Sequence, residues 1–357
     1  MSKQQSTPFF SVIVPIYNRI TFIDSGITCL LNQSFSDYEV ILIDDGSTDG
    51  SAAVCDEIAR NEKITTIHKE NGGPGSARNA GLERARGVYV CFFDIDDHVS
   101  DDWLEKVYRH LSDKKLELLV YGYRECNPIL GTVSEFLFDD SIYLTNEALR
   151  ASYSVSLSGI RFNNGFVWNK VYKRDFLTHN DIRFPNLSIQ QDEVFNHAVY
   201  KKVERSSTIS EIMYDYYVYN EGTGRFATIT DRTAIFTSVR NSFLNLYDFW
   251  RLDDAKLLTY IHGRFIQSIL YNRNKVGLRG ACAYADEIFA TKEVEESVAY
   301  LGSDRVAADK SIDRLYRIAI KKRSKLLWLL ADLKEWMIRK AKNAYRSVVP
   351  RRPFANK

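Results

Sequence analysis

The sequence predicts an α/β protein built on a mixed, mostly parallel sheet with helices on both faces. Strand-like and helix-like segments alternate through the first hundred residues. The strand-like segments are short and continuously apolar, which is typical of parallel strands buried on both faces. Polar or glycine-rich clusters follow three of the first four, and ligands bind at that edge of parallel sheets. We therefore expect the functional site beyond the carboxyl ends of these strands.

Each element is indicated by its own residue pattern. Apolar runs rich in β-branched and aromatic residues predict strands, and apolar residues at helical spacing predict helices between them. The expected strands are residues 9–16, 38–43, 64–68, 89–93, 116–123 and 208–219, and the expected helices are residues 22–32, 49–60, 76–85 and 101–111. Beyond about residue 231 the pattern is helical, with few glycines or prolines before Pro350. We place a domain boundary near residue 230, dividing residues 1–230 from a helical C-terminal region at 231–357.

Composition excludes several classes of protein. With 45% hydrophobic and 26% charged residues among 357, the chain is neither disordered nor a small disulfide scaffold. Its five cysteines are scattered, without CxxC spacing, which predicts reduced core residues in a cytoplasmic protein. We identify no signal peptide at the N-terminus. The most apolar helical stretch, residues 326–338, contains three charged residues and is too short to span a bilayer.

The net charge of +2 hides a strong asymmetry. Residues 310–357 contain 15 lysines and arginines but only three acidic residues, so the rest of the chain is acidic. Within this region, residues 315–352 form a basic amphipathic pattern that suits an anionic membrane surface, at the inner face of the plasma membrane. A core-facing helix with a solvated basic side, or a homodimer contact, fits the pattern equally well. Nucleic acid is disfavoured as the partner of this segment, because binding to nucleic acid would not require the apolar side of an amphipathic helix.

Clustered carboxylates follow the strand at 89–93. Asp94 and Asp96 are two apart on an extended segment, so they can present their carboxylates on the same side, and Asp97 follows directly. Clustered carboxylates repel each other unless a cation lies between them, and hard divalent ions such as Mn²⁺ and Mg²⁺ prefer oxygen ligands. The alternative is an acidic loop that caps the next helix. The pattern favours a metal site at Asp94 and Asp96.

Two further clusters indicate a nucleotide site. Asp44 and Asp45 end the second strand, where an acidic residue can accept from a ribose hydroxyl or a base N–H, although an Asx turn explains the cluster as well. The segment 71–79 is glycine-rich but lacks the spacing of the known phosphate-binding loops. Arg78 lies in the first turn of the helix that follows, where a cation is electrostatically unfavourable. This local cost indicates that Arg78 has a functional role.

Four segments together resemble the family 2 glycosyltransferases, which have the GT-A fold. They are VIVPIYN (12–18), IDDGSTD (43–49), NGGPGSARNAG (71–81) and FFDIDD (92–97), in this order and at these separations. The resemblance is dense over about 110 residues. It implies that residues 1–125 bind a nucleotide sugar, and that residues 126–230 bind an acceptor.

The resemblance also implies roles for individual residues. Arg78 would meet the nucleobase, and the acidic motif would hold Mn²⁺ or Mg²⁺ against the diphosphate. The donor-binding set is Pro15, Tyr17, Asn18, Asp44, Asp45, Gly73, Arg78, Asp94 and Ile95, and the metal set is Asp94, Asp96 and Asp97. VWNKVY (167–172) and QDEVFN (191–196) resemble a later stretch of family members that build bacterial surface polysaccharides such as capsule and lipopolysaccharide. The catalytic base of the family falls on Asp192, although Gln191 and Glu193 depart from the pattern and leave Glu193 as a second candidate.

The expected function is therefore metal-dependent, inverting transfer of a sugar from a nucleoside diphosphate, by resemblance UDP, to a hydroxyl of a glycan or lipid-linked acceptor. Two other classes stay open. A nucleotidyltransferase would need the same pocket and metal but should carry a basic glycine-rich loop after its first strand, where this chain has VPIYNR. A non-catalytic sugar-nucleotide-binding protein would bind the donor without turnover. The sequence does not identify the sugar, because loop geometry decides that.

Overall fold

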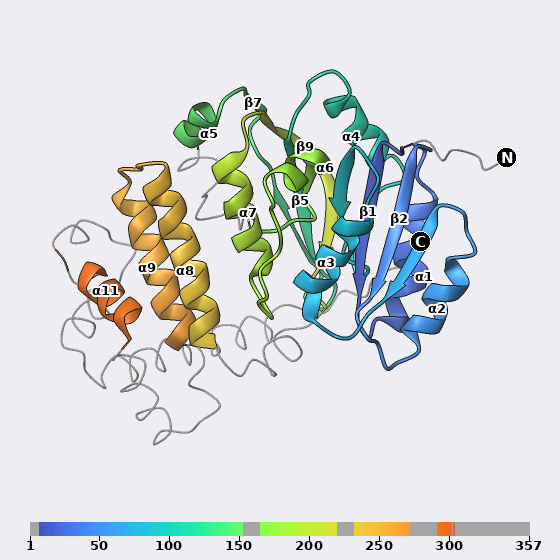
Figure 1. Cartoon of the computed structure of the whole chain (residues 1–357), viewed down its shortest axis with the longest axis horizontal. Coiled ribbons are helices and arrows are strands. Elements are labelled where there is room, and N and C mark those ends of the chain that lie inside the picture. Colours follow the sequence, from blue (N-terminus) through green and yellow to red (C-terminus); the bar gives the residue numbers. More distant parts are fainter. Residues whose placement is uncertain (1–6, 153–164, 220–231, 271–290, 302, 304–357) are drawn as a thin grey trace. The chain divides into compact units, whose positions relative to one another are not determined.

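The computed structural model of the chain describes residues 7–152, 165–219, 232–270, 291–301 and 303 (Figure 1). The chain forms two compact units, residues 1–227 and residues 228–357. The first contains a single sheet with its helices, and the described part of the second is helical. The basic amphipathic segment expected at 315–352 lies outside the described residues.

The sheet has the strand order β3-β2-β1-β4-β8-β5-β9-β7, with β6 paired to β5. Its strands are β1 (Phe10–Ile16), β2 (Tyr38–Asp44), β3 (Ile64–His68), β4 (Tyr89–Phe92), β5 (Leu118–Asn127), β6 (Thr132–Phe136), β7 (Ser141–Tyr143), β8 (Lys170–Lys173) and β9 (Ser206–Tyr217). The first four strands are parallel neighbours, β5 and β9 are parallel to each other, and β8 is antiparallel to both β4 and β5. The mixed sheet flanked by helices that the sequence predicts is confirmed, although the pairings among the described strands are evenly divided, with four parallel and four antiparallel.

The helices of the first unit are α1 (Ile20–Leu31), α2 (Ser51–Ile58), α3 (Gly73–Arg84), α4 (Trp103–Leu111), α5 (Asn146–Ser152), α6 (Arg174–His179) and α7 (Gln191–Lys202). Both faces of β1 are covered, because successive side chains of a strand point to opposite faces. Val12 and Val14 belong to the core cluster that includes Ile27 of α1 and Leu104 of α4. Ile13 points the other way, and a Cβ added to Gly81 of α3 would lie 2.4 Å from its Cγ2. This close approach brings α3, and the loop before it, against the sheet.

The sequence did not predict β6, β7 and β8. β8 is four residues long and includes two lysines, so its pattern resembles an amphipathic turn more than a core strand. It is a strand because β4 and β5 lie on either side and satisfy its backbone hydrogen bonds. Its antiparallel direction matters for the site, since the amino-terminal end of β8 lies beside the carboxyl end of β4.

The second unit contains α8 (Arg232–Phe249), α9 (Ala255–Leu270) and α11 (Lys292–Leu301). α8 and α9 pack side by side, and α11 packs against α9 (Figure 1). Buried Ile261 and Phe265 of α9, together with Val294 and Val298 of α11, supply its apolar interior. None of the helices in the described ranges combines the length and the apolar character needed to cross a bilayer.

Candidate active site

The loops that follow β1 and β2 meet at one edge of the sheet. After β1, Tyr17 is 46% exposed and Asn18 has a φ of +50°. The Oδ1 of Asn18 accepts from the backbone N–H of Thr48 at 2.8 Å, and the N–H of Asn18 donates to the Oγ of Ser47 at 3.0 Å. These bonds join the loops that follow β1 and β2. Tyr17 is left with an exposed ring beside them.

The two aspartates at the end of β2 are buried and bonded to the protein. Asp44 accepts from the backbone N–H of Ser47 and lies 3.0 Å from the Nδ1 of His68. Burial opposes its ionisation, but these partners outweigh burial and hold the pKa of Asp44 below its usual value. The local consequence is a fixed turn after β2.

Asp45 organises the glycine loop that precedes α3. Its Oδ1 accepts from Lys69 Nζ at 2.7 Å and from the N–H of Gly72 at 3.0 Å, and its Oδ2 accepts from the N–H of Gly73 at 2.8 Å. Gly73 has a φ of +81°, which favours glycine, and a Cβ at this position would have open space around it. Asp45 thus sets the shape of a loop whose backbone stays accessible.

The Asp94–Asp97 segment is divided by burial. The side chains of Asp94 and Asp96 are 17% and 16% exposed, and they lie 2.8 Å from Arg78 and 3.5 Å from Arg19 respectively. Asp97 is buried and accepts from the hydroxyl of Tyr214 at 2.9 Å and from the N–H of Tyr217 at 2.8 Å. Burial, together with the charges of Asp94 and Asp96, raises the pKa of Asp97 well above its usual value. Asp94 and Asp96 therefore face the open edge, while Asp97 is held by β9.

The donor set of Asp94 and Asp96 fits a hard divalent cation. Both supply carboxylate oxygens and both are partly accessible, and Asp96 and Asp94 lie beside Arg19 and Arg78 respectively. Across the described ranges, no three histidine, cysteine or acidic side chains form a closed metal cluster. An open pair is what Mg²⁺ or Mn²⁺ uses when substrate phosphates complete its coordination.

Ile95, between these aspartates, is buried against α1. An ideal Cβ at Gly26 would lie 2.5 Å from the carbonyl oxygen of Ile95. We therefore expect Gly26→Ala to lower the free energy of unfolding by about 1–3 kcal/mol, because the backbone of the acidic segment would have to move. Chemical denaturation measures this loss. Gly263→Ala in α9 is the matched control, since a Cβ there would meet nothing within 4 Å and alanine favours a helix by up to about 1 kcal/mol. Equal effects of the two substitutions would contradict this packing.

Arg78 is buried beside the acidic segment. It is 5% exposed, and its Nη2 donates to the Oδ1 of Asp94 at 2.8 Å. Its guanidinium carbon lies 5.7 Å from the ring centre of Phe184. Its Nε and Nη1 have no hydrogen-bond partner among the residues that the structure describes. Unpartnered buried donors are costly, so these two N–H groups are suited to an anionic or oxygen-rich ligand.

Asp192 lies in the first turn of α7, after Gln190, which has a φ of +60°. The residue as a whole is partly exposed although its carboxyl group is buried, whereas Glu193 as a whole residue is only 4% exposed. Burial of its carboxylate raises the pKa of Asp192 to about 6, against the lowering effect of the Arg78 charge and with a further increase from Glu193. A carboxylate with a pKa near neutrality is suited to accept a proton. Of the two neighbours, Asp192 is the more accessible.

Sequence reasoning missed the residues that hold this site together. The hydroxyl of Tyr214 accepts from the N–H of Asp94 at 3.1 Å and donates to Asp97, and its ring stacks on Trp168 at 4.6 Å. The tyrosine-rich alternation of β9 was the available signal, but nothing local says that β9 reaches the acidic segment. Asn169 and Lys170 are both fully buried, although they belong to a segment that the sequence singled out.

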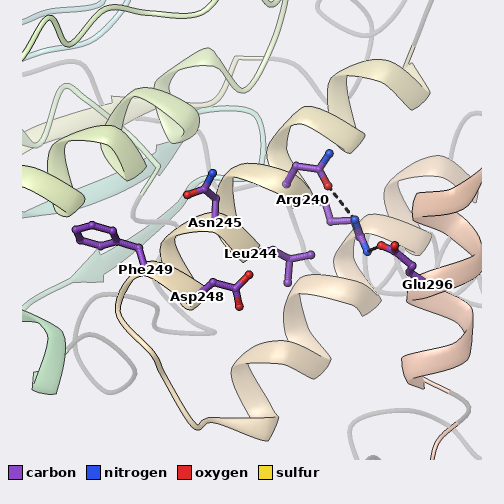
Figure 2. A pocket seen from close by; sticks show the side chains of 7 residues that line it. Arg240, Leu244, Asn245, Asp248, Phe249 and Glu296 are labelled. Atoms are coloured by element: carbon purple, nitrogen blue, oxygen red, sulfur yellow. Dashed lines mark hydrogen bonds and ion pairs between the residues drawn. The ribbon is translucent and has the colours of Figure 1, made fainter.

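A hollow lies on the helical unit (Figure 2). It has a volume of about 630 Å³ and is lined by Arg240, Asn241, Leu244, Asn245, Asp248, Phe249 and Glu296. Arg240 donates to Asn241, Glu296 and Ser297, each at 2.8 Å. Its charge is therefore engaged by neighbouring side chains of the same unit.

Comparisons with known proteins agree on one family. The family described as "Glycosyl transferase family 2" matches residues 11–138. An uncharacterized glycosyltransferase of Haemophilus influenzae is 32% identical over 201 residues, which is 56% of this chain and 74% of that protein. The uncharacterized glycosyltransferase EpsJ of Bacillus subtilis is 27% identical over 281 residues, 77% of this chain and 72% of that protein. A solved structure of Staphylococcus aureus TarS residues 1–349, in complex with UDP-GlcNAc, is similar in fold with a TM-score of 0.64. It is 22% identical, and the match covers 92% of this chain and 91% of that one.

Proposed function

The chain belongs to the family 2 glycosyltransferases and has their GT-A fold, and on that premise we propose that it transfers a sugar from a UDP-linked donor to a hydroxyl group with inversion of the anomeric carbon. The observation that carries this proposal is the position of Arg78, which is bonded to Asp94 while its charge acts on Asp192. One buried cation therefore interacts both with Asp94 of the acidic pair and with the candidate base. The UDP-GlcNAc complex of TarS supports UDP as the nucleotide.

The donor would bind along the strand ends, with its base and ribose nearest β1 and β2. The exposed ring of Tyr17 offers a surface for a base, and the accessible backbone at Gly73 lets a ligand approach closely. Asp44 and Asp45 would contribute partly through the turns that they fix. The proposed donor contacts are Pro15, Tyr17, Asn18, Asp44, Asp45, Gly73, Arg78, Asp94 and Ile95. The unpartnered N–H groups of Arg78 are suited to the diphosphate.

Asp94 and Asp96 would hold Mn²⁺ or Mg²⁺, with Asp97 directly behind them. A bound divalent ion supplies charge neutralisation for the departing diphosphate. Asp97 would hold the acidic segment in place, because it accepts hydrogen bonds from Tyr214 and Tyr217 of β9. Arg78 adds a fixed positive charge at the same place and needs no rearrangement to do so.

Asp192 would act as the general base. As the acceptor oxygen attacks the anomeric carbon, its proton passes to the carboxylate of Asp192. The bond between the anomeric carbon and the β-phosphate oxygen breaks, and its electron pair stays on the phosphate. One displacement of this kind inverts the anomeric carbon. No general acid is required, because a nucleoside diphosphate leaves as a stabilised anion.

The rate of sugar transfer should depend on pH through Asp192. Its raised pKa, about 6, means that the carboxyl group is protonated at lower pH and cannot accept a proton. We expect kcat to be constant above about pH 7 and to fall about tenfold for each pH unit below 6. Initial rates at saturating donor between pH 4.5 and 9 measure this. Circular dichroism at each pH checks that the protein stays folded, and a flat profile across this range would contradict the assignment.

A donor panel tests the proposal as a whole. Calorimetry with UDP, GDP and dTDP in the presence of Mn²⁺ identifies the nucleotide, and release of the diphosphate from the corresponding sugars measures turnover. Binding of UDP with turnover of one UDP-sugar supports the proposal. Binding without turnover of any sugar, with candidate acceptors present, favours a non-catalytic binding protein, and release of pyrophosphate from a nucleoside triphosphate favours a nucleotidyltransferase.

The acceptor would be a glycan or lipid-linked hydroxyl in bacterial surface polysaccharide synthesis. For a lipid-linked acceptor the enzyme would work at the cytoplasmic face of the membrane, and the basic segment 315–352 would bind anionic lipid there. Sedimentation with vesicles that contain phosphatidylglycerol, before and after removal of residues 321–357, tests this. If the truncated protein sediments as fully as the intact one, this segment is not the anchor, and a homodimer contact becomes its alternative role.

A further inference from the structure

Lys170, the first residue of β8, is a fully buried lysine that the proposed mechanism does not use. Its ammonium group donates to the carbonyl oxygen of Phe166 at 2.5 Å and to the Oδ1 of Asn169 at 2.8 Å. Both acceptors are neutral, so they satisfy its hydrogen bonds without balancing its charge. Buried charges of this kind are expensive and rare unless a counter-charge is near.

The side chain of Lys170 faces the first turns of α7. Lys170 and Tyr172 are two apart on β8 and therefore share a face of the sheet. The hydroxyl of Tyr172 donates to the Oδ1 of Asn196 at 2.7 Å. The Nδ2 of Asn196 donates to the carbonyl oxygen of Phe166 at 3.2 Å, the same oxygen that Lys170 uses. Asn196 is one helical turn after Asp192, so this network links the ammonium to the helix that carries the candidate base.

The charges around this pair come from four elements. Burial lowers the pKa of Lys170 to about 7, and the carboxylate of Asp192 acts in the opposite direction. Asp192 itself is influenced by Arg78 of α3, by Glu193 of α7 and by Asp94 after β4. Tyr172 also faces the pair, but burial raises its pKa well above the usual value, so it stays neutral. Among the described residues, the charge of Arg78 therefore acts on Asp192, and the charge of Asp192 acts on Lys170.

We propose that Lys170 is a positioning residue whose buried ammonium is the counter-charge that keeps Asp192 ionised while substrates occupy the site. This inference rests on the proposed role of Asp192 as the base. Arg78 cannot fill this role alone, because it is bonded to Asp94 and a bound diphosphate would engage its remaining N–H groups. Substrates also exclude water, which favours the protonated form of a carboxyl group. Lys170 acts from the protein side, where no substrate competes for its charge.

Lys170→Met removes the charge and keeps a side chain of similar length. The acid limb of the pH–rate profile should move to higher pH by about one unit, and the rate should return toward that of the unchanged protein at pH 9. The matched control is Lys173→Met, which removes a lysine from the other end of the same strand and should leave the profile unchanged. Lys170→Gln, which keeps an amide donor, is measured in parallel in case methionine prevents folding.

A direct titration separates this inference from the proposed function. In protein labelled with ¹³C-aspartate, the carboxyl resonance of Asp192 is assigned by its absence in Asp192→Asn, and its midpoint is measured in the free protein and with UDP and Mg²⁺ bound. A higher midpoint in Lys170→Met supports the inference. An unchanged midpoint in both Lys170 variants overturns it, even if activity falls. If Asp192→Asn keeps full transfer activity, the assignment of the base fails instead.

Discussion

Asp192→Asn should lower kcat for sugar transfer by about 10²–10⁴-fold, because an amide cannot accept the proton of the acceptor hydroxyl. Affinity for the nucleotide should stay unchanged, since the carboxylate faces the acceptor side in the proposed mechanism. Single-turnover rates with the donor found in the panel, together with calorimetry of UDP binding, separate the two effects. A loss of binding equal to the loss of rate would point to a role in holding the donor.

Glu193→Gln is the matched control for this substitution, because it makes the same change at the neighbouring carboxylate. It should keep most of the activity, since Glu193 is buried. If the large loss appears at Glu193 and not at Asp192, the base is Glu193.

Stability should move in the opposite direction to activity in Asp192→Asn. The folded-state pKa of Asp192 is raised from 3.8 to about 6, so its ionised form is disfavoured in the fold. This penalty is absent below the unfolded-state pKa and grows as pH rises through the folded-state value. At pH 7 the asparagine variant should therefore unfold at an equal or higher denaturant concentration. A large fall in stability would mean that lost activity reflects damage to the fold.

Asp96→Asn should weaken the binding of a metal–nucleotide complex and lower kcat by about 10²-fold or more, a loss comparable to that of a single electrostatic donor to a transition state. Two carboxylates hold a divalent ion with their combined charge, and removal of one leaves a weaker site. Titration of activity with Mn²⁺ should show a higher half-saturating concentration, and a chelator should abolish the activity of the unchanged enzyme. Full activity of Asp96→Asn in chelator would contradict the proposed metal site.

Asp97→Asn provides the contrast, because this carboxylate is already bonded to protein donors. Removal of the charge relieves the burial that raises the pKa of Asp97, but the amide offers one acceptor oxygen where Asp97 offers one to Tyr214 and one to Tyr217. Because one buried donor then loses its acceptor, the substitution should mainly lower stability, by about 1–3 kcal/mol. The Mn²⁺ dependence of the remaining activity should resemble that of the unchanged enzyme. If it changes as strongly as in Asp96→Asn, Asp97 is a metal ligand as well.

The parallel half of the sheet could be predicted because its signals are local. Each of β1, β2, β3 and β4 is an apolar run that ends at a polar cluster, and a buried strand needs little else to be recognised. The boundaries differ by a few residues from expectation, as at α3, which begins at Gly73 rather than at residue 76. The short strands β6, β7 and β8 could not be predicted, since their pairing depends on neighbours that are distant in the sequence.

Within the site, the sequence supplied the residues but not their partners. Asp45 appeared as a candidate nucleotide ligand, and the fold also makes it the residue that shapes the glycine loop. Arg78 appeared as a contact for the base, and the fold bonds it to Asp94. The unusual burial of Lys170 could not be predicted from VWNKVY, because the residues next to a lysine in a short strand do not show whether its side chain is buried.

The sequence alone determined the family, the order of the strands and helices that carry it, and the edge of the sheet where its polar residues collect. Hydrophobic periodicity and the polar residues at strand ends are properties of neighbouring residues, so they can be recognised in the sequence without the fold. Only the tertiary structure decided that Tyr214 holds the acidic segment, that Arg78 is bonded to Asp94 and acts on Asp192, and that Lys170 is buried and shares an acceptor with Asn196 of α7. These arrangements depend on burial and on contacts between residues that are far apart in the sequence. The energy of interaction between charges inside a protein is set by their distance in space and by the exclusion of water, and both are known only from the fold.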